Sequence, residues 1–299
     1  MKYKLWQKWL LGIFRLVIFL LACYFIYHVI QENITALKAL EVKHKPLFVG
    51  TFIVSNLIYI MLMMALVFAW LVLLKFKEPQ RCAKIYFKSQ IMKYLPGNIF
   101  HFMYRHQQTK NKNFTHKQLG MAALHETIIL IIGAFLVSQF LFIWPGEITW
   151  LTNWLPMPFW VLFLIEVIGA IFVAKILINT GFLTTLISYF AYFSGMGLIT
   201  YLLIFALGFE SQPYLFITAC FSASWLAGYV IPGAPGGTGV REVVFILLCT
   251  PKMAEYEALI IIALIRLLSI LAETIIYLMA SRLSQPYRHF SIWSDRTMP

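Results

Sequence analysis

The stretch that decides the fold covers residues 213–250 and reads PYLFITACFSASWLAGYVIPGAPGGTGVREVVFILLCT. It is apolar on both sides of a cluster of prolines and glycines at positions 232–239. Because proline lacks the backbone donor and glycine weakens a helix, helical hydrogen bonding must fail at this cluster. A helix after the cluster, over residues 238–248, would rise only about 15 Å, half of a hydrocarbon core of about 30 Å. The pattern predicts a broken or re-entrant helix pair near residues 213–250, with its break facing a cavity.

The composition of the chain indicates that its solvent is hydrocarbon. Of the 299 residues, 61% are hydrophobic and only 12% are charged, and the mean hydropathy is +0.79. Soluble domains carry about 25% charged residues. We therefore expect an all-α polytopic membrane protein that forms a single integral membrane domain over residues 1–299, with no soluble domain.

Six apolar runs are long enough to cross a membrane as full spans, which takes about 20 residues each. They cover residues 9–30, 46–74, 119–144, 159–178, 182–207 and 258–280. Residues 82–104 are also apolar but contain three lysines and a Pro96-Gly97 break, so a re-entrant or interfacial helix is expected there. Most of the 24 Lys and Arg residues fall on one side of this arrangement. The positive-inside rule then predicts cytoplasmic N- and C-termini in the cell inner membrane.

Ionisable residues inside the apolar segments are the candidate functional groups. Each costs about 2 to 3 kcal/mol to insert unless it faces a partner or water. They are Arg15, Glu126, Glu166, Arg241, Glu242, Arg266 and Glu273. Arg266 and Glu273 are seven residues apart, hence on one helix face, which should point inward. Arg15 and Glu166 lie near span ends or lack a companion motif, and we interpret both as structural.

The glycine-rich break has the features of an anion site. Gly236, Gly237 and Gly239 would let a ligand approach backbone NH groups closely. A helix that begins near Thr238 would direct its positive end at the break. A phosphate is the type of group that such a site binds.

Two charged residues follow the break directly. Glu242 is favourable at a helix N-terminus and could act as a cap, whereas Arg241 is unfavourable there. Binding of a phosphate would explain Arg241, because its guanidinium forms charge-assisted bidentate hydrogen bonds. The alternative is a salt bridge from Arg241 to Glu126 or Glu273 that only holds helices together.

An earlier stretch has related features. Lys93-Tyr-Leu-Pro-Gly-Asn98 contains a Pro-Gly break, Arg105 follows it, and Glu126 lies on the next span. Pro-Gly breaks in both halves, each followed by an arginine and an intramembrane glutamate, are typical of an internally repeated transporter. The pattern therefore favours an inverted repeat whose two breaks meet. The alternative is that the first Pro-Gly forms an interfacial turn.

These motifs resemble the lysylphosphatidylglycerol synthase transmembrane-domain family, the membrane half of the multiple peptide resistance factor. The resemblance covers essentially the whole chain. The residues that carry it are Lys93, Leu95, Pro96, Gly97, Asn98, Arg105, Glu126, Trp225, Gly228, the segment Pro235-Gly-Gly-Thr-Gly-Val-Arg-Glu242, and Arg266. It implies a stand-alone, flippase-like member that moves lipids or lipid-linked glycans, without the soluble aminoacyl-transferase half. Thr238 departs from the more apolar residue expected at its position.

Three functions stay open at the level of sequence. The first is a lipid translocase for an anionic phospholipid, an aminoacylated phospholipid or a polyprenyl-phosphate-linked glycan. Its expected substrate-binding residues are Lys93, Asn98, Arg105, Glu126, Gly236, Gly237, Thr238, Gly239, Arg241, Glu242, Arg266 and Glu273. The second is a membrane-embedded glycosyl or lipid transferase, and the third is a non-catalytic partner of a cell-envelope assembly complex.

The expected partners follow from the charge and its location. The net charge of +12 is attributed to contact with anionic lipid and the membrane, not with nucleic acid. Homo-oligomerisation and cell-envelope biosynthesis partners are left open. The sequence contains no motif for catalysis, metal or cofactor binding, so none is expected, and the protein is not expected to be an enzyme.

Overall fold

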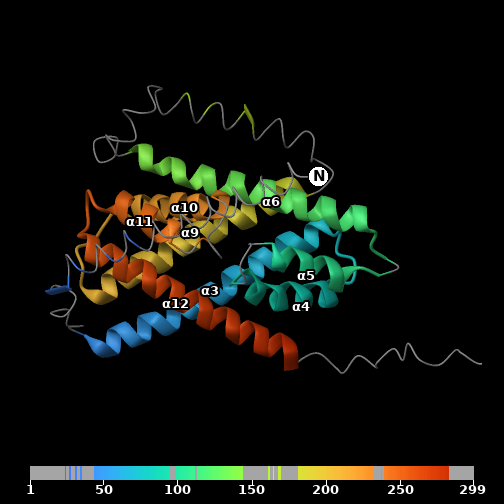
Figure 1. Cartoon of the computed structure of the whole chain (residues 1–299), viewed down its shortest axis with the longest axis horizontal. Helices are drawn as coiled ribbons and strands as arrows, with labels where there is room; N and C mark the ends of the chain where they lie inside the picture. The colour runs from blue at the N-terminus through green and yellow to red at the C-terminus, as the bar shows by residue number, and fades with distance from the viewer. Residues whose placement is uncertain are drawn as a thin grey trace, which may run out of the picture.

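The fold consists of helices. The computed structural model of the chain describes residues 44–94, 99–111, 113–143, 181–231, 237 and 239–282, together with single positions near residues 24–35 and 161–169. Within these ranges there is no strand, only one isolated bridge between Asn111 and Phe114. Figure 1 shows the helices packed side by side, most of them elongated along one direction.

Within the described ranges, four long helices form the frame. They are α3 (Lys45–Leu73), α6 (His116–Ser138, continued by the 3-10 helix η2, Gln139–Ile143), α9 (Phe182–Leu207) and α12 (Glu255–Arg282). Each is long and apolar enough to cross a membrane, which identifies a membrane protein. They coincide with four of the six expected spans, which are thereby confirmed as apolar helices. The expected spans at residues 9–30 and 159–178 lie almost entirely outside the described residues.

Large apolar side chains on the outer faces fit the same environment. Met61 is 72% exposed, Leu183 is 66% exposed and Phe205 is 61% exposed. Exposed apolar faces of this extent require an apolar surrounding, since in water they would promote association.

Four short helices lie between the long ones and form two pairs. The first pair is α4 (Pro79–Gln90, continued by the 3-10 helix η1, Ile91–Tyr94) and α5 (Phe100–Thr109). The second pair is α10 (Tyr214–Val230) and α11 (Val240–Cys249). The members of each pair pack against each other. A proline-and-glycine segment, largely outside the described residues, separates the two members of each pair.

Two sequence predictions about these short helices need correction. Residues 82–104 do not form one helix, because helical structure ends at Tyr94 and restarts at Phe100. The second helix of the other pair begins at Val240 and not near Thr238, because Gly237 and Gly239 have φ values of 75° and 91°. A right-handed helix cannot contain this left-handed backbone, which glycine adopts readily.

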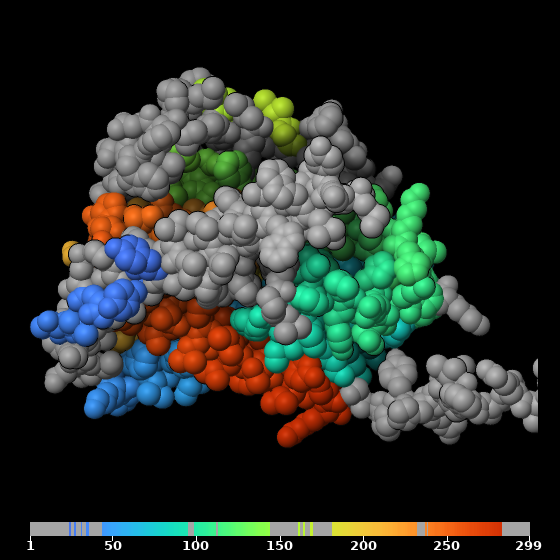
Figure 2. Space-filling model, viewed as in Figure 1, coloured from blue at the N-terminus to red at the C-terminus, as the bar shows by residue number. Residues whose placement is uncertain are grey.

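The order of the helices repeats along the chain. Both α3–α6 and α9–α12 consist of a long helix, two short helices and a second long helix. Corresponding helices of the two halves make corresponding contacts. The last long helix of each half packs on the first short helix of the other half (α6 on α10, α12 on α4), and also on the first long helix of the other half (α6 on α9, α12 on α3). The first long helices, α3 and α9, contact each other. Figure 1 shows that α3 and α9 run in opposite directions, and so do α6 and α12. Figure 2 shows α12 beside α4 and α5 on one face, which is one of these contacts between the halves.

Candidate functional site: a cationic cavity between the two short helix pairs

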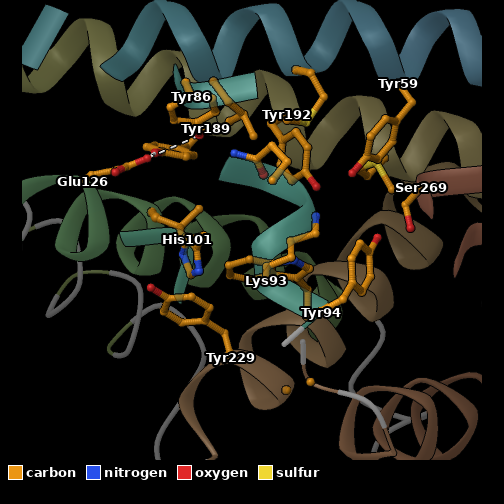
Figure 3. Close-up of a pocket in the computed structure, with 18 of the residues that line it drawn as sticks. Tyr59, Tyr86, Lys93, Tyr94, His101, Glu126, Tyr189, Tyr192, Tyr229 and Ser269 are labelled. Carbon is orange, nitrogen blue, oxygen red and sulfur yellow. Dashed lines mark hydrogen bonds between the residues drawn. The ribbon is translucent and has the colours of Figure 1, made fainter. Parts of the chain in front are cut away.

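A cavity of about 120 Å³ lies where the two short helix pairs approach each other (Figure 3). Each pair lines it from both sides of its break, with Tyr94 and His101 in the first pair and Tyr229 and Arg241 in the second. The long helices supply the remaining walls. The volume is sufficient for several water molecules, so polar groups in its wall can stay hydrated.

The first ion pair at this cavity joins α5 to α6. A guanidinium nitrogen of Arg105 lies 2.8 Å from Glu126, and the two side chains are only 3% and 5% exposed. Tyr86 and Tyr189 donate hydrogen bonds to the same carboxylate at 3.3 and 3.2 Å (Figure 3). The Arg105 guanidinium also lies 4.6 Å from the centre of the Trp70 ring. Such extra contacts are needed to offset the large desolvation cost of a buried pair.

The second ion pair joins α11 to α12. The Arg266 Nε lies 2.6 Å from Glu242, which sits in the first turn of α11. The other carboxylate oxygen of Glu242 accepts a hydrogen bond of 2.6 Å from the Gly239 backbone N–H. Glu242 therefore caps α11 and fixes its start against α12. The structural role that the sequence suggested for Glu242 is confirmed.

The third ion pair joins the two halves of the chain. Lys93 in η1 pairs with Glu273 of α12, a carboxylate that is almost completely buried. Tyr59 of α3 donates a hydrogen bond of 2.5 Å to the same group. Figure 3 shows the Lys93 and Tyr94 side chains extending into the space between the helices. A break residue of one half is thus held by a long helix of the other half.

Arg241 differs from the other three cations of the cavity. Among the described residues it forms no ion pair, and its Nε is buried without a hydrogen-bond partner. Its guanidinium lies 4.7 Å from the centre of the Phe221 ring. The alternative salt bridge to Glu126 or Glu273 is therefore wrong, because Arg105 and Lys93 occupy those carboxylates.

Most of the expected site residues come together around this cavity. Six of them line it: Lys93, Arg105, Glu126, Gly237, Arg241 and Arg266. Glu242 and Glu273 pair with the lining residues Arg266 and Lys93, and Gly239 donates its backbone N–H to Glu242. Asn98, Gly236 and Thr238 lie outside the described residues, as do Arg15 and Glu166. Arg266 and Glu273 both point inward, as their spacing predicted.

The close approach of Gly228 and Gly237 explains two of the glycines. A Cβ atom on Gly237 would lie 3.0 Å from the Gly228 carbonyl oxygen, and one on Gly228 would lie 3.0 Å from the Arg241 Cβ. The backbone of α10 thus packs directly against the segment that leads into α11. This contact places Arg241 at the cavity.

Sequence reasoning missed the tyrosines. The cavity wall contains Tyr59, Tyr86, Tyr94, Tyr189, Tyr192 and Tyr229. A usable signal was present, because Tyr59 and Tyr192 lie inside long apolar helices, whereas tyrosines of membrane proteins favour the interfaces. A buried tyrosine needs a partner for its hydroxyl, so a tyrosine within a span points to a polar interior.

The described ranges contain no group of three or more His, Cys, Asp or Glu side chains that could hold a metal ion. Comparison of the chain with protein-family models, with curated proteins and with solved structures gives no match. The cavity and its charges are therefore the observations from which function is inferred.

Proposed function

We propose that this protein is a flippase-like lipid translocase that moves an anionic lipid across the cytoplasmic membrane by way of the central cavity. The observation that carries the proposal is Arg241: a half-buried arginine without a carboxylate partner among the described residues, in a cavity between two helix breaks. An intramembrane cation without a partner is costly, and it marks a substrate pathway more often than a structural joint.

The charges around the cavity support an anionic substrate. Among the described residues, the cavity has four cations (Lys93, Arg105, Arg241 and Arg266) and three carboxylates nearby. Each carboxylate pairs with Lys93, Arg105 or Arg266, so within the described part of the chain one positive charge is in excess, that of Arg241. A phosphodiester headgroup with one negative charge would restore neutrality and accept hydrogen bonds from the guanidinium and the nearby tyrosines.

The architecture supports translocation. We interpret the two sets of four helices as an inverted repeat, with α4–α5 and α10–α11 as re-entrant pairs whose breaks meet inside the bilayer. Transporters of this kind bind substrate between their repeats and alternate access by moving one repeat against the other. The topology that we propose keeps both termini in the cytoplasm. Anionic phospholipids, aminoacylated phospholipids and polyprenyl-phosphate-linked glycans all share the required phosphate.

Reconstituted vesicles test the proposal. Full-length protein in vesicles that contain a fluorescent phosphatidylglycerol should speed the movement of this lipid between leaflets, and Arg241→Gln should slow it by at least about tenfold, the loss of one charge-assisted interaction. Arg282→Gln removes an arginine at the exposed end of α12 and is the matched control. If Arg241→Gln and wild type move the lipid equally fast, the assignment of Arg241 is wrong.

A further inference from the structure

A second pocket, of about 290 Å³, lies between α3, α5 and α6. Its wall is mainly apolar, with Trp70 from α3, Met103 from α5, and Leu119 and Ala123 from α6. The polar residues in its lining, Arg105, His106 and Gln107, all belong to α5. The pocket is therefore suited to hydrocarbon over most of its surface.

The apolar pocket and the cationic cavity share a wall. Phe102 and Arg105 line both. The Arg105 guanidinium lies 2.8 Å from Glu126 on the cavity side and 4.6 Å from the centre of the Trp70 ring, which lines the apolar pocket. A ligand with a phosphate in the cavity and an apolar chain beside Trp70 would extend past the side chains of Phe102 and Arg105.

The helices around the apolar pocket carry apolar side chains on their outer faces. Phe100 is 38% exposed and Met103 is 46% exposed on α5, and Leu124 is 51% exposed on α6. In a membrane such faces contact lipid chains. The pocket therefore lies next to the source of its occupant.

We propose that the apolar pocket holds an acyl chain of the lipid whose phosphate binds in the cationic cavity, and that the lipid enters laterally between α5 and α6. This inference rests on the proposed function and specifies its substrate as a lipid with its phosphate close to the acyl chains. An acyl chain supplies atomic contacts that the walls of an unfilled void lack.

The proposed occupant is a single acyl chain. A chain of methylene groups is much narrower than a helix, which is about 10–12 Å across with its side chains. It suits a pocket with the apolar residues Trp70, Leu119 and Ala123 in its wall.

Photolabelling tests the occupant. Full-length protein is reconstituted in vesicles with a phosphatidylglycerol that carries a diazirine in the middle of one acyl chain, then illuminated, and adducts are mapped by mass spectrometry. We expect adducts on Leu119 or Ala123, because Met103 is also exposed on the outer face. Ala123→Trp fills the pocket and should reduce these adducts by at least about fivefold, since a packed site does not accept added volume.

Two further variants control for bulk and folding. Leu124→Trp places the same indole on the neighbouring exposed position of α6 and should leave the adducts unchanged. Ala123→Leu is a milder filling that keeps the test valid if the tryptophan variant does not fold, and it should reduce the adducts in part. Adducts confined to outer-face positions such as Leu124, or unchanged by both substitutions at Ala123, would overturn the proposal.

The outcomes separate this inference from the proposed function. If Ala123→Trp leaves labelling and lipid movement at wild-type levels while Arg241→Gln stops movement, the acyl-chain pocket is wrong and the translocase stands. If wild-type protein moves no lipid but the adducts map to the pocket, the translocase is wrong and the pocket binds lipid. A photoreactive residue placed at position 123 that cross-links only to another segment of the chain shows a protein occupant and overturns the inference.

Discussion

The two short helix pairs have the same design and hold their arginines differently. In α4–α5, Arg105 is fully buried and paired with Glu126 of the following long helix. In α10–α11, Arg241 has no carboxylate partner within the described residues, although its following long helix also carries a buried glutamate, Glu273. The same helix–break–helix unit thus holds Arg105 in an ion pair in one half, whereas Arg241 in the other half has no carboxylate partner among the described residues.

The cause of this difference lies in the contact between the halves. Glu273 occupies the place that Glu126 has in the first half, on the second long helix, but its partner is Lys93 from the first break. No lysine from the second break competes for Glu126 in the same way, because residues 231–240 contain none. One additional cation in the first half therefore leaves Arg241 without a carboxylate partner among the described residues.

The largest effect is expected from Arg105→Gln. It leaves the Glu126 carboxylate buried without a cation, and the loss of one partner from a buried pair costs about 3–5 kcal/mol. Thermal unfolding in detergent micelles measures the loss. The double variant Arg105→Met/Glu126→Leu removes both charges and should recover most of the stability. A loss below about 1 kcal/mol in the single variant would contradict a buried, desolvated pair.

A backbone variant tests the contact that positions the second pair. Gly237→Ala adds a Cβ atom at a φ of 75°, 3.0 Å from the Gly228 carbonyl oxygen, and should cost about 2 kcal/mol. Gly120→Ala is the control, because its Cβ meets nothing within 4 Å and a helical alanine stabilises by about 0.5–1 kcal/mol. Opposite signs of the change in unfolding temperature are expected. Equal effects would show that the Gly228–Gly237 contact does not hold the break.

Arg241→Gln is expected to be neutral or stabilising. It removes a half-buried charge that has no ion-pair partner among the described residues, and it loses the contact with the Phe221 ring, so the net gain should not exceed about 1 kcal/mol. The same unfolding measurement, beside Arg105→Gln, gives the comparison. A loss of several kcal/mol would indicate a hidden carboxylate partner and would remove the asymmetry.

The smallest effect concerns Glu78, the hydrogen-bonded carboxylate directly before α4 at the start of the first pair. Hydrogen bonds from Arg81, Asn113 and Asn111 lower the pKa of Glu78 from 4.5 to about 2. A depressed pKa gives stability that is present above pH 4.5 and is lost as the pH falls towards 2. Because the group is near the surface, the contribution should stay below about 1 kcal/mol.

Acid titration of unfolding checks this small effect. The difference in unfolding temperature between wild type and Glu78→Gln should be largest near pH 6 and should shrink as the pH falls towards 2. A difference that does not depend on pH would show that the carboxylate is not charged in its network.

The sequence predicted the helices and breaks around the site better than the contacts between them. The four described spans follow from apolar length, and the breaks follow from proline and glycine, because both properties are local. It placed the Pro96-Gly97 break but treated residues 82–104 as one re-entrant or interfacial helix, whereas α4 with η1 and α5 are separate helices. It also missed Tyr59 and Tyr192, because residue type alone does not show that two helix faces meet at a cavity.

The sequence by itself determined that the chain is a helical membrane protein and that the charged residues within its apolar segments face inward. In a bilayer the backbone must satisfy its own hydrogen bonds, so long apolar runs become helices and embedded charges turn inward. Only the tertiary structure decided which cation pairs with which carboxylate. The pairs join residues that are 21, 24 and 180 positions apart, and helix packing alone sets such distances. Of the four cavity cations, packing therefore left Arg241 without a carboxylate partner in the part of the chain that the structure describes.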